Sequence, residues 1–244
     1  MNEIEKFHRE VLERIEEFAN DPKLKQQALE WVTQAIARKY VYNFTWLGRP
    51  IIQTPADIVG IQELIWTVQP DLIVETGIAH GGSLILSASM LELIGGDGKV
   101  VGIDIDIRRH NRDEIEKHPM YKRIEMIEGS SIDETIVQKV HKIAESFKTI
   151  LVILDSKHTH DHVSRELEVY SPLVSVGSYV IVLDTFIEDL PAELFNDVPW
   201  GIGNNPKTAV RDFLATNNNF EADAMIENKL LTTTAPSGFL KRIR

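Results

Sequence analysis

The sequence of 244 residues contains no cysteine, which excludes disulfide bonds, thiolate metal ligands and a cysteine nucleophile. No uncharged apolar run reaches the length of roughly 18 residues that a membrane helix needs, so we expect no membrane span. Positive charge is also scarce: 26 lysines and arginines face 37 aspartates and glutamates, a formal net charge of −11. Proteins that bind nucleic acid generally carry excess positive charge, so we expect no nucleic-acid partner. The charged N-terminus lacks the apolar stretch of a secretion signal, which together with the missing cysteine favours a cytoplasmic location.

The apolar content is ordinary for a folded protein, with 43% hydrophobic and 26% charged residues. At this length we expect one large domain with a small appended element. Residues 1–47 predict two amphipathic helices separated by Asn20-Asp21-Pro22. Apolar residues recur at spacings of three and four along both helices: Ile4, Phe7, Val11, Ile15 and Phe18, then Leu24, Ala28, Trp31 and Ala35.

These two predicted helices must bury their apolar stripes against another surface. That surface is either the main domain of the same chain or the same helices of a neighbouring subunit, and both alternatives stay open. We therefore divide the chain into an N-terminal helical extension, residues 1–47, and a main domain, residues 48–244, and expect a homo-oligomer. The segment Trp46-Leu47-Gly48-Arg49-Pro50 is expected to connect the two parts.

From residue 55 onward, short β-branched runs alternate with longer amphipathic runs, which is typical of parallel strands joined by crossover helices. The predicted strands cover residues 71–75, 100–104, 124–128, 150–155 and 179–184. The predicted helices cover residues 56–68, 82–94, 109–118, 133–147, 161–170 and 206–215. At the C-terminus, residues 220–226 and 239–243 are expected to pair as an antiparallel hairpin. The sequence thus predicts an α/β, Rossmann-like fold with a mostly parallel, seven-stranded sheet.

Ligands of such sheets bind beyond the carboxyl ends of the strands, so the residues that follow each strand are the informative ones. The first strand is followed by a glycine-rich loop in which small residues allow sharp bends and close approach to a ligand: Gly77, Ala79, Gly81 and Gly82, then Ser83. The loop begins with the acidic Glu75, which suits a cofactor that carries an ammonium group and would repel a pyrophosphate. The alternative is a turn that only packs tightly.

The next two strands end in residues that suit a nucleoside. Asp104 closes the second strand, where an acidic residue typically accepts hydrogen bonds from a ribose diol. Ser130 and Ser131 follow the third strand and could reach an adenine edge, although a role of Ser131 or Asp133 as a helix cap is an equal alternative.

The fourth and fifth strands end in carboxylates, Asp155 and Asp184, which would converge on one hard cation such as Mg²⁺. His158 lies three residues after Asp155 and is a candidate general base that removes the proton of an acceptor hydroxyl. We expect His160 and His162 to orient the start of the next helix or to face solvent. The long segment through Asn205 could act as a lid, with Trp200 either stacking on a substrate or packing.

Several stretches taken together resemble the family that includes cephalosporin hydroxylase and rhamnosyl O-methyltransferases; they are residues 74–83, 102–108, 129–131, 154–160 and 200–206. The arrangement also resembles Mg²⁺-dependent sugar O-methyltransferases of macrolide biosynthesis and, more distantly, catechol O-methyltransferase. The resemblance implies that Asp155 binds the metal and that His158 is the base. In these relatives the fifth strand ends with two metal ligands, whereas this chain has Leu183-Asp184, or Asp184-Thr185 if the register slips by one residue. Glu188 or water would have to replace the missing ligand.

We therefore expect an S-adenosylmethionine-dependent O-methyltransferase, assisted by Mg²⁺, that acts on a hydroxyl of a sugar, a glycolipid or another natural product. Two alternatives remain at this point. One is a nicotinamide-dependent oxidoreductase, because a ribose-binding acid such as Asp104 suits either cofactor. The other is a non-catalytic ligand-binding relative, which the irregular Leu183 suggests.

Overall fold

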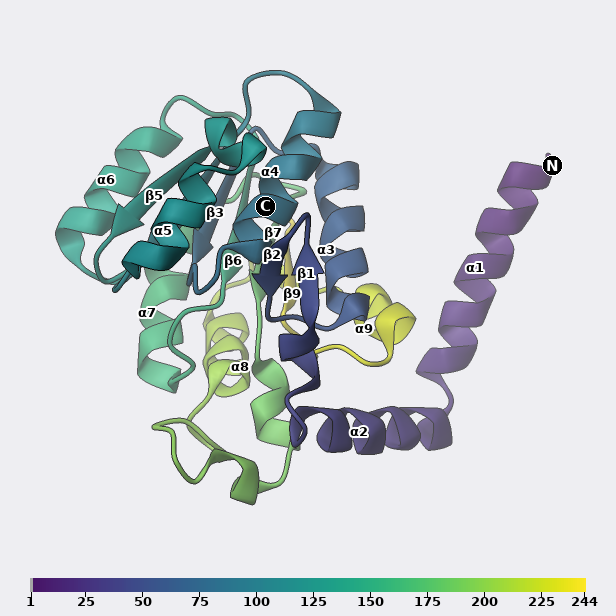
Figure 1. The fold of residues 1–244 in the computed structure, drawn as a ribbon. Coiled ribbons are helices and arrows are strands. Elements are labelled where there is room, and N and C mark those ends of the chain that lie inside the picture. The colour runs from purple at the N-terminus through teal and green to yellow at the C-terminus, as the bar shows by residue number, and fades with distance from the viewer. Residues whose placement is uncertain (1) are drawn as a thin grey trace.

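The computed structural model describes residues 2–244 and confirms the predicted α/β class (Figure 1). In the described residues the main sheet has seven strands in the order β5-β4-β3-β6-β7-β9-β8. Its parallel strands are β3 (Leu72–Thr76), β4 (Lys99–Asp104), β5 (Ile124–Glu128), β6 (Ile150–Leu154) and β7 (Tyr179–Val182). The antiparallel strands β9 (Phe239–Arg242) and β8 (Phe220–Ala222) complete one edge.

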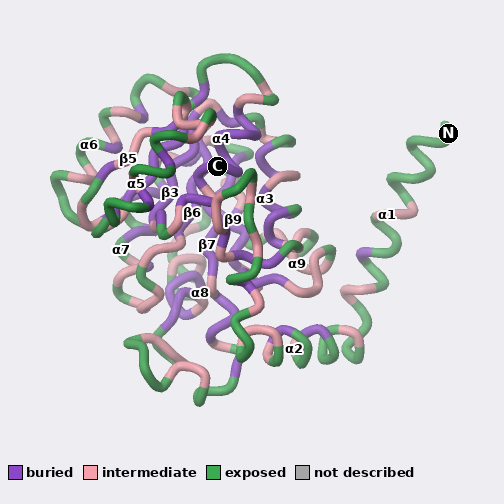
Figure 2. Tube along the Cα trace, viewed as in Figure 1, coloured by how far each residue is buried: buried purple, intermediate pink, exposed green. Residues whose placement is uncertain are grey.

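Helices cover both faces of this sheet, and each face has its own apolar core. One face carries α3 (Pro55–Val68), α4 (Gly82–Ile94) and α5 (Arg109–Glu116); the other carries α6 (Glu134–Ala144), α7 (His160–Tyr170) and α8 (Pro206–Thr216). Because the central strands are covered on both sides, they are apolar throughout instead of alternating, as the run Ile150–Leu154 shows. The buried strands form the centre of the molecule in Figure 2.

The strand order reverses between β3 and β6, and this point determines where a ligand can bind. From β3 the chain proceeds outward through β4 to β5, and it then returns to the other side of β3 with β6 and β7. Thr76 at the end of β3 pairs with Ile103 of β4 on one side and with Leu154 of β6 on the other. The loops that follow these strands therefore leave the sheet at one common edge, which forms a crevice at the switch point.

The C-terminal hairpin is confirmed, but the predicted strand 220–226 is wrong in its second half. The strand ends at Ala222, and α9 (Ala224–Leu230) follows at once. Asp223 causes the change, because its carboxylate accepts a hydrogen bond of 3.1 Å from the backbone amide of Met225 and so caps the helix.

The predicted connector at residues 46–50 is a small hairpin instead. Strands β1 (Phe44–Trp46) and β2 (Arg49–Ile51) pair around a turn in which Leu47 and Gly48 have positive φ angles. The indole of Trp46 donates a hydrogen bond of 3.0 Å to the hydroxyl of Ser89 on α4. The hairpin spans the predicted boundary at residue 47, and the division into extension and main domain stays a prediction.

The predicted N-terminal helices are α1 (Glu3–Ala19) and α2 (Pro22–Ile36). Val32 of α2 packs into an apolar cluster of the same chain with Phe186 and Ile187 from the segment after β7. The start of α1 is different, because Ile4 and Phe7 are 68% and 59% exposed. In Figure 1 the N-terminal end of α1 points away from the main body, whereas the helix also contacts α9 and buries Ile15. None of the helices in residues 2–244 has the length and apolarity that crossing a membrane requires.

Candidate active site

The predicted site residues other than Glu75 and Gly81 line two adjoining cavities at the switch point of the sheet. The first, of about 220 Å³, is lined by Ser83, Asp155, His158 and Asp184 among others. The second, also of about 220 Å³, is lined by Asp104, Ser130 and Ser131. Gly77, Ala79, Asp155 and Ser156 border both cavities, so the two form one cleft.

Glu75 is fully buried in β3 and contacts Ser83, which lines the first cavity. The hydroxyl of Ser83 donates a hydrogen bond to its Oε1, whereas its Oε2 is buried without any hydrogen-bond partner. Burial raises the pKa of Glu75 from 4.5 to about 7, against the opposing effect of the Ser83 hydrogen bond. A buried carboxylate oxygen without a donor is costly, and an ammonium group would supply the missing donor. Glu75 therefore fits the amino group of a methionine-like ligand.

The glycines after Glu75 are required by close packing within the protein. Gly77 has a φ of +91°, and a Cβ there would overlap the carbonyl of Asp155, at the end of β6. A Cβ on Gly82 would overlap the carbonyl of Pro50 in the small hairpin. The loop is thus pressed between β6 and β2, which holds its backbone against the cleft.

Two residues that the sequence did not single out hold the outer side of this loop. The guanidinium of Arg49 donates hydrogen bonds of 3.0 and 2.7 Å to the carbonyl of His80. The amide of Asn111 donates one of 2.9 Å to the carbonyl of Ala79. Neither residue stood out in the sequence, since Arg49 lay in the presumed connector and Asn111 in a polar helix.

Asp104 faces the same loop from the end of β4. Its Oδ2 accepts hydrogen bonds from the backbone amides of Ile78 and Ala79 at 2.8 and 3.2 Å, and its Oδ1 accepts one from Asp106 at 3.1 Å. The carboxylate thus fixes the loop. Both lone pairs of Oδ2 are used by the loop amides, whereas Oδ1 keeps a further lone pair, so Asp104 can still accept a hydrogen bond from a ligand hydroxyl at Oδ1.

Asp155, His158 and Asp184 come together at the other end of the first cavity, where one ligand atom of each lies within 4.8 Å of the others. His158 Nε2 is 3.2 Å from Asp184 Oδ2. Burial raises the pKa of Asp155 well above its usual range, and the charges of Asp184 and Glu75 add to this effect. Burial likewise raises the pKa of Asp184, opposed by His158. Carboxylate oxygens that repel each other in a buried site are a donor set that fits a hard divalent cation.

Neither Leu183 nor Glu188 supplies a second carboxylate ligand after β7. Leu183 is buried in the apolar core beside α3 and α4 and offers no donor. Glu188, the predicted substitute, is engaged in the loop that follows, because its Oε2 accepts hydrogen bonds from the amide of Gly203, at 2.7 Å, and from the side chain of Asn205. The carboxylates that remain for a cation are therefore Asp155 and Asp184, beside the imidazole of His158.

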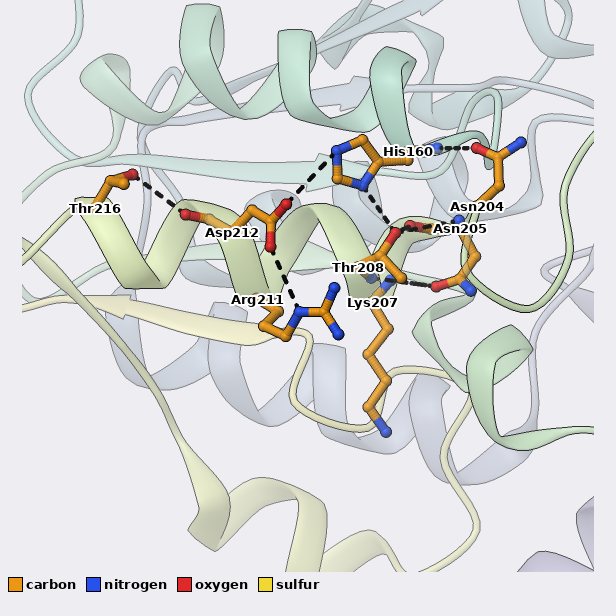
Figure 3. A network of polar contacts seen from close by, with 8 residues as sticks. All are labelled: His160, Asn204, Asn205, Lys207, Thr208, Arg211, Asp212 and Thr216. Carbon is orange, nitrogen blue, oxygen red and sulfur yellow. Dashed lines mark hydrogen bonds and ion pairs between the residues drawn. The ribbon is translucent and has the colours of Figure 1, made fainter.

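A polar network clamps the segment after β7 onto α7 and α8 (Figure 3). Asn204 Oδ1 accepts a hydrogen bond of 2.9 Å from the backbone amide of His160, and the His160 ring lies 2.8 Å from the Thr208 hydroxyl. His160 thus orients the helix start, in agreement with the sequence prediction. The clamped segment brings Trp200 edge-on against His158, with ring centroids 4.8 Å apart.

Ser131 makes a contact that the sequence did not reveal. Its hydroxyl donates a hydrogen bond of 2.6 Å to Glu166, a fully buried residue of α7. The cap of α6 is Asp133, which accepts a hydrogen bond of 2.9 Å from Thr135. Ser130 borders the second cavity.

Gln53 is a further residue that sequence reasoning missed. Its side chain is only 3% exposed, it lines the first cavity, and its Oε1 has no hydrogen-bond partner. Because Gln53 precedes the Thr54 cap of α3, its sequence context resembled an ordinary helix start.

Comparison with known proteins agrees with this geometry. The family model described as rhamnosyl O-methyltransferase/CmcI matches residues 38–243. The rhamnosyl O-methyltransferase of Mycobacterium tuberculosis is 30% identical over 205 residues, which cover 81% of this chain and 78% of that protein. The protein of the same name from Mycobacterium leprae is 29% identical over 224 residues, which cover 86% of this chain and 92% of that protein.

Solved structures support the fold. A structure of CmcI with Mg and S-adenosylmethionine has a TM-score of 0.55 at 19% identity. The match covers 83% of this chain and 78% of the CmcI chain. An O-methyltransferase from Bacillus cereus in complex with S-adenosylhomocysteine has a TM-score of 0.53 at 19% identity, covering 81% of this chain and 82% of its own.

The predicted enzyme class, an S-adenosylmethionine-dependent O-methyltransferase, is confirmed by the family match and by the relatives in sequence. None of these matches supports the alternative of a nicotinamide-dependent oxidoreductase. The chain belongs to the rhamnosyl O-methyltransferase/CmcI family.

Proposed function

We propose that this protein transfers a methyl group from S-adenosylmethionine to a hydroxyl of a sugar, with the assistance of a divalent cation. The observation that carries the proposal is the grouping of Asp155, His158 and Asp184 at one cavity, with Glu75 buried next to the cavity-lining Ser83 and lacking a donor at Oε2. The sugar class comes from the relatives, which are named rhamnosyl O-methyltransferases.

The first part of the proposal concerns the methyl donor, which supplies an electrophilic methyl group on a positively charged sulfur. Glu75 binds its ammonium group through the unpartnered Oε2. Ser83 and the backbone of residues 77–81 bound the methionine part, and Asp104 accepts a hydrogen bond from the ribose. Asp155 adds negative charge near the sulfonium. Because these groups are held by the packing around Gly77 and Gly82, they are positioned before the donor arrives.

The second part concerns the acceptor. Asp155 and Asp184 would hold the cation, whose charge would lower the pKa of the acceptor hydroxyl. His158 accepts the proton of that hydroxyl while the oxygen attacks the methyl group. Asp184 lies 3.2 Å from the imidazole and stabilises the imidazolium that results. Trp200 packs against the other side of His158 and keeps its ring in place.

The test is an assay of methyl transfer from labelled S-adenosylmethionine to methyl α-L-rhamnoside, with Mg²⁺ or with a chelator. We expect product that depends on Mg²⁺. Asp155→Asn, which keeps the shape of the side chain but removes the charge, should abolish it. The absence of transfer to this and to other hydroxylated sugars, with S-adenosylhomocysteine still bound, would instead favour a non-catalytic relative.

We further propose that α1 and α2 form an N-terminal extension through which the protein self-associates. The exposed apolar residues Ile4, Phe7 and Leu12 on α1 support this proposal, since isolated apolar stripes of this kind usually find a partner. Light scattering of the full chain measures the mass in solution, and a strictly monomeric protein at micromolar concentration would contradict it.

A further inference from the structure

A buried polar network lies beside the second cavity and has no part in the proposed methyl transfer. It joins Ser131 after β5, Ser156 after β6, and His162 and Glu166 on α7. Both serine hydroxyls donate hydrogen bonds to Glu166 Oε1, at 2.6 and 2.7 Å. The imidazole Nε2 of His162 lies 3.1 Å from the Ser131 hydroxyl and 3.0 Å from the Ser156 hydroxyl.

The number of protons in this network determines which ring nitrogen of His162 carries the hydrogen. Each serine has a single hydroxyl proton, and both are donated to Glu166. The serine oxygens can then only accept at His162 Nε2, so Nε2 carries a hydrogen. In the neutral ring this leaves Nδ1 as an acceptor. Glu166 thus determines, through two serines, which ring nitrogen of His162 is free to bind a donor.

Three of these four residues face the cavity that also contains Asp104. His162, Ser131 and Ser156 line the cavity of about 220 Å³, together with Ile103 and Ile105. If Asp104 binds the ribose, as proposed above, the nucleobase of the donor lies in this same cavity. The side chain of His162 keeps an exposed fraction of 12%, whereas Glu166 behind it has none. His162, unlike Glu166, is therefore within reach of a base in this cavity.

We propose that His162 recognises the exocyclic amino group of the adenine by accepting its N–H at Nδ1, and that Glu166 is the positioning residue that sets the ring for this task. The inference rests on the proposed function, because it requires a nucleoside in the second cavity. It goes beyond that function by naming the residue that distinguishes a 6-amino purine from a 6-oxo purine. A 6-oxo purine presents a carbonyl at this position, which would face an acceptor with another acceptor.

The network could instead serve only to join β5, β6 and α7. Two substitutions distinguish a purely structural role from recognition of the base, because each retains the hydrogen-bonding group of one ring nitrogen. His162→Gln retains an N–H near the position of Nε2, and so retains the contacts to Ser131 and Ser156. His162→Asn retains an oxygen near the position of Nδ1 but loses those contacts.

The experiment compares binding of S-adenosylhomocysteine and S-inosylhomocysteine to the full chain by isothermal titration calorimetry. We expect the wild type to prefer the adenosyl ligand by roughly 10- to 100-fold, the loss expected when a hydrogen bond is replaced by a clash of two acceptors. His162→Gln should remove most of this preference by lowering the affinity for the adenosyl ligand alone. His162→Asn should keep part of the preference. Glu166→Gln should reduce it. His8→Gln on α1 is the matched control and should leave it unchanged.

Each result has one meaning. If the wild type binds neither ligand, the proposed function fails and the inference with it. If the wild type binds S-adenosylhomocysteine but binds the inosyl ligand equally well, the proposed function stands and the inference is wrong. If the wild type discriminates and His162→Gln discriminates equally, the network is structural and His162 does not read the base.

Discussion

At one end of the cleft, the partly buried Asp155 and Asp184 lie near the fully buried Glu75, whereas at the other end Glu166 accepts hydrogen bonds from two hydroxyls and faces an imidazole. We call these the acidic end and the paired end. Burial raises the pKa of the three carboxyl groups at the acidic end, and at Asp155 the charges of Asp184 and Glu75 add to this effect. Such an arrangement costs free energy in the free protein and is compensated when cations bind.

The paired end shows the opposite use of a carboxylate. Oε1 of Glu166 accepts hydrogen bonds from hydroxyls at two strand ends, although its Oε2, like Oε2 of Glu75, is buried without a hydrogen-bond partner. Burial of an acidic residue and an unpartnered oxygen therefore do not by themselves indicate a binding role. The grouping of Asp155, His158 and Asp184 around one point distinguishes the acidic end.

The largest expected effect concerns His158, the only imidazole at the acidic end in the described residues. His158→Gln removes the base but keeps a polar side chain of similar size. We expect kcat for methyl transfer to fall by about 10²- to 10⁴-fold, the usual contribution of a general base. Calorimetry of S-adenosylhomocysteine binding should show an unchanged affinity. Turnover at the wild-type rate would exclude His158 from the mechanism.

The next effect separates Glu75 from Glu166 by the sign of a stability change. Burial raises the pKa of Glu75 from 4.5 to about 7, so the folded state binds its proton more tightly than the unfolded state. The stability that the protonated Glu75 carboxyl contributes is therefore lost as the pH rises from 4.5 to 7. Above pH 7 this loss does not increase further. A shift of this size corresponds to about 3 kcal/mol.

Glu75→Gln removes this ionisation, so at pH 8 and without ligand the variant should unfold at higher denaturant concentration than the wild type. The advantage should shrink as the pH falls toward 4.5. Glu166→Gln at the paired end should not be stabilised at any pH. Urea unfolding of the three proteins at several pH values measures the difference, and parallel behaviour of the two variants would remove the distinction between the two ends.

A cation should stabilise the acidic end selectively. Mg²⁺ at 100 times its Kd would contribute about 2.7 kcal/mol, which raises the Tm of a protein of this size by roughly 5–10 °C. Asp184→Asn should abolish the increase, and Glu166→Gln should leave it intact. A thermal scan with and without Mg²⁺ gives the answer, and an equal increase in all three proteins would indicate binding elsewhere.

The smallest effect on catalysis is expected far from both ends. Phe7→Glu places a charge on the exposed stripe of α1, where Phe7 is 59% exposed. We expect a lower mass in light scattering and a change in kcat/KM of less than about twofold, in line with the small effects of most surface substitutions. A large loss of activity in a monomeric variant would show that the cleft needs the neighbouring copy.

The acidic end could be predicted from the sequence, whereas the paired end could not. Glu75 lies near the end of β3, Asp155 follows β6 directly and Asp184 follows β7 after one residue; parallel strands bring such positions to one edge of the sheet. The contact of Glu166 with Ser131 and Ser156 depends on the exact packing of α7, which no local pattern encodes. The same limit explains Arg49 and Asn111, whose partners are 31 or 32 residues away in the chain.

The fold likewise has elements that follow from long sequence patterns and elements that depend on one or two residues. The long apolar strands and the periodic helices of the sandwich were predictable because their patterns extend over many residues. The short helix after Ala222 was not, because the Asp223 cap that starts it lies inside an otherwise strand-like run. The hairpin at residues 44–51 depends equally on one turn, Leu47-Gly48.

The most direct test of the account is the proton balance when S-adenosylhomocysteine binds at pH 7. Titrations in two buffers of different ionisation enthalpy give the number of protons released. Because the pKa of Glu75 is about 7 in the free protein, about half of the molecules must lose its proton when the ammonium group arrives. We predict a release of about 0.5 proton that disappears in Glu75→Gln. Tight binding with no proton release in either buffer would contradict the claim that the acidic end holds the positively charged part of the donor.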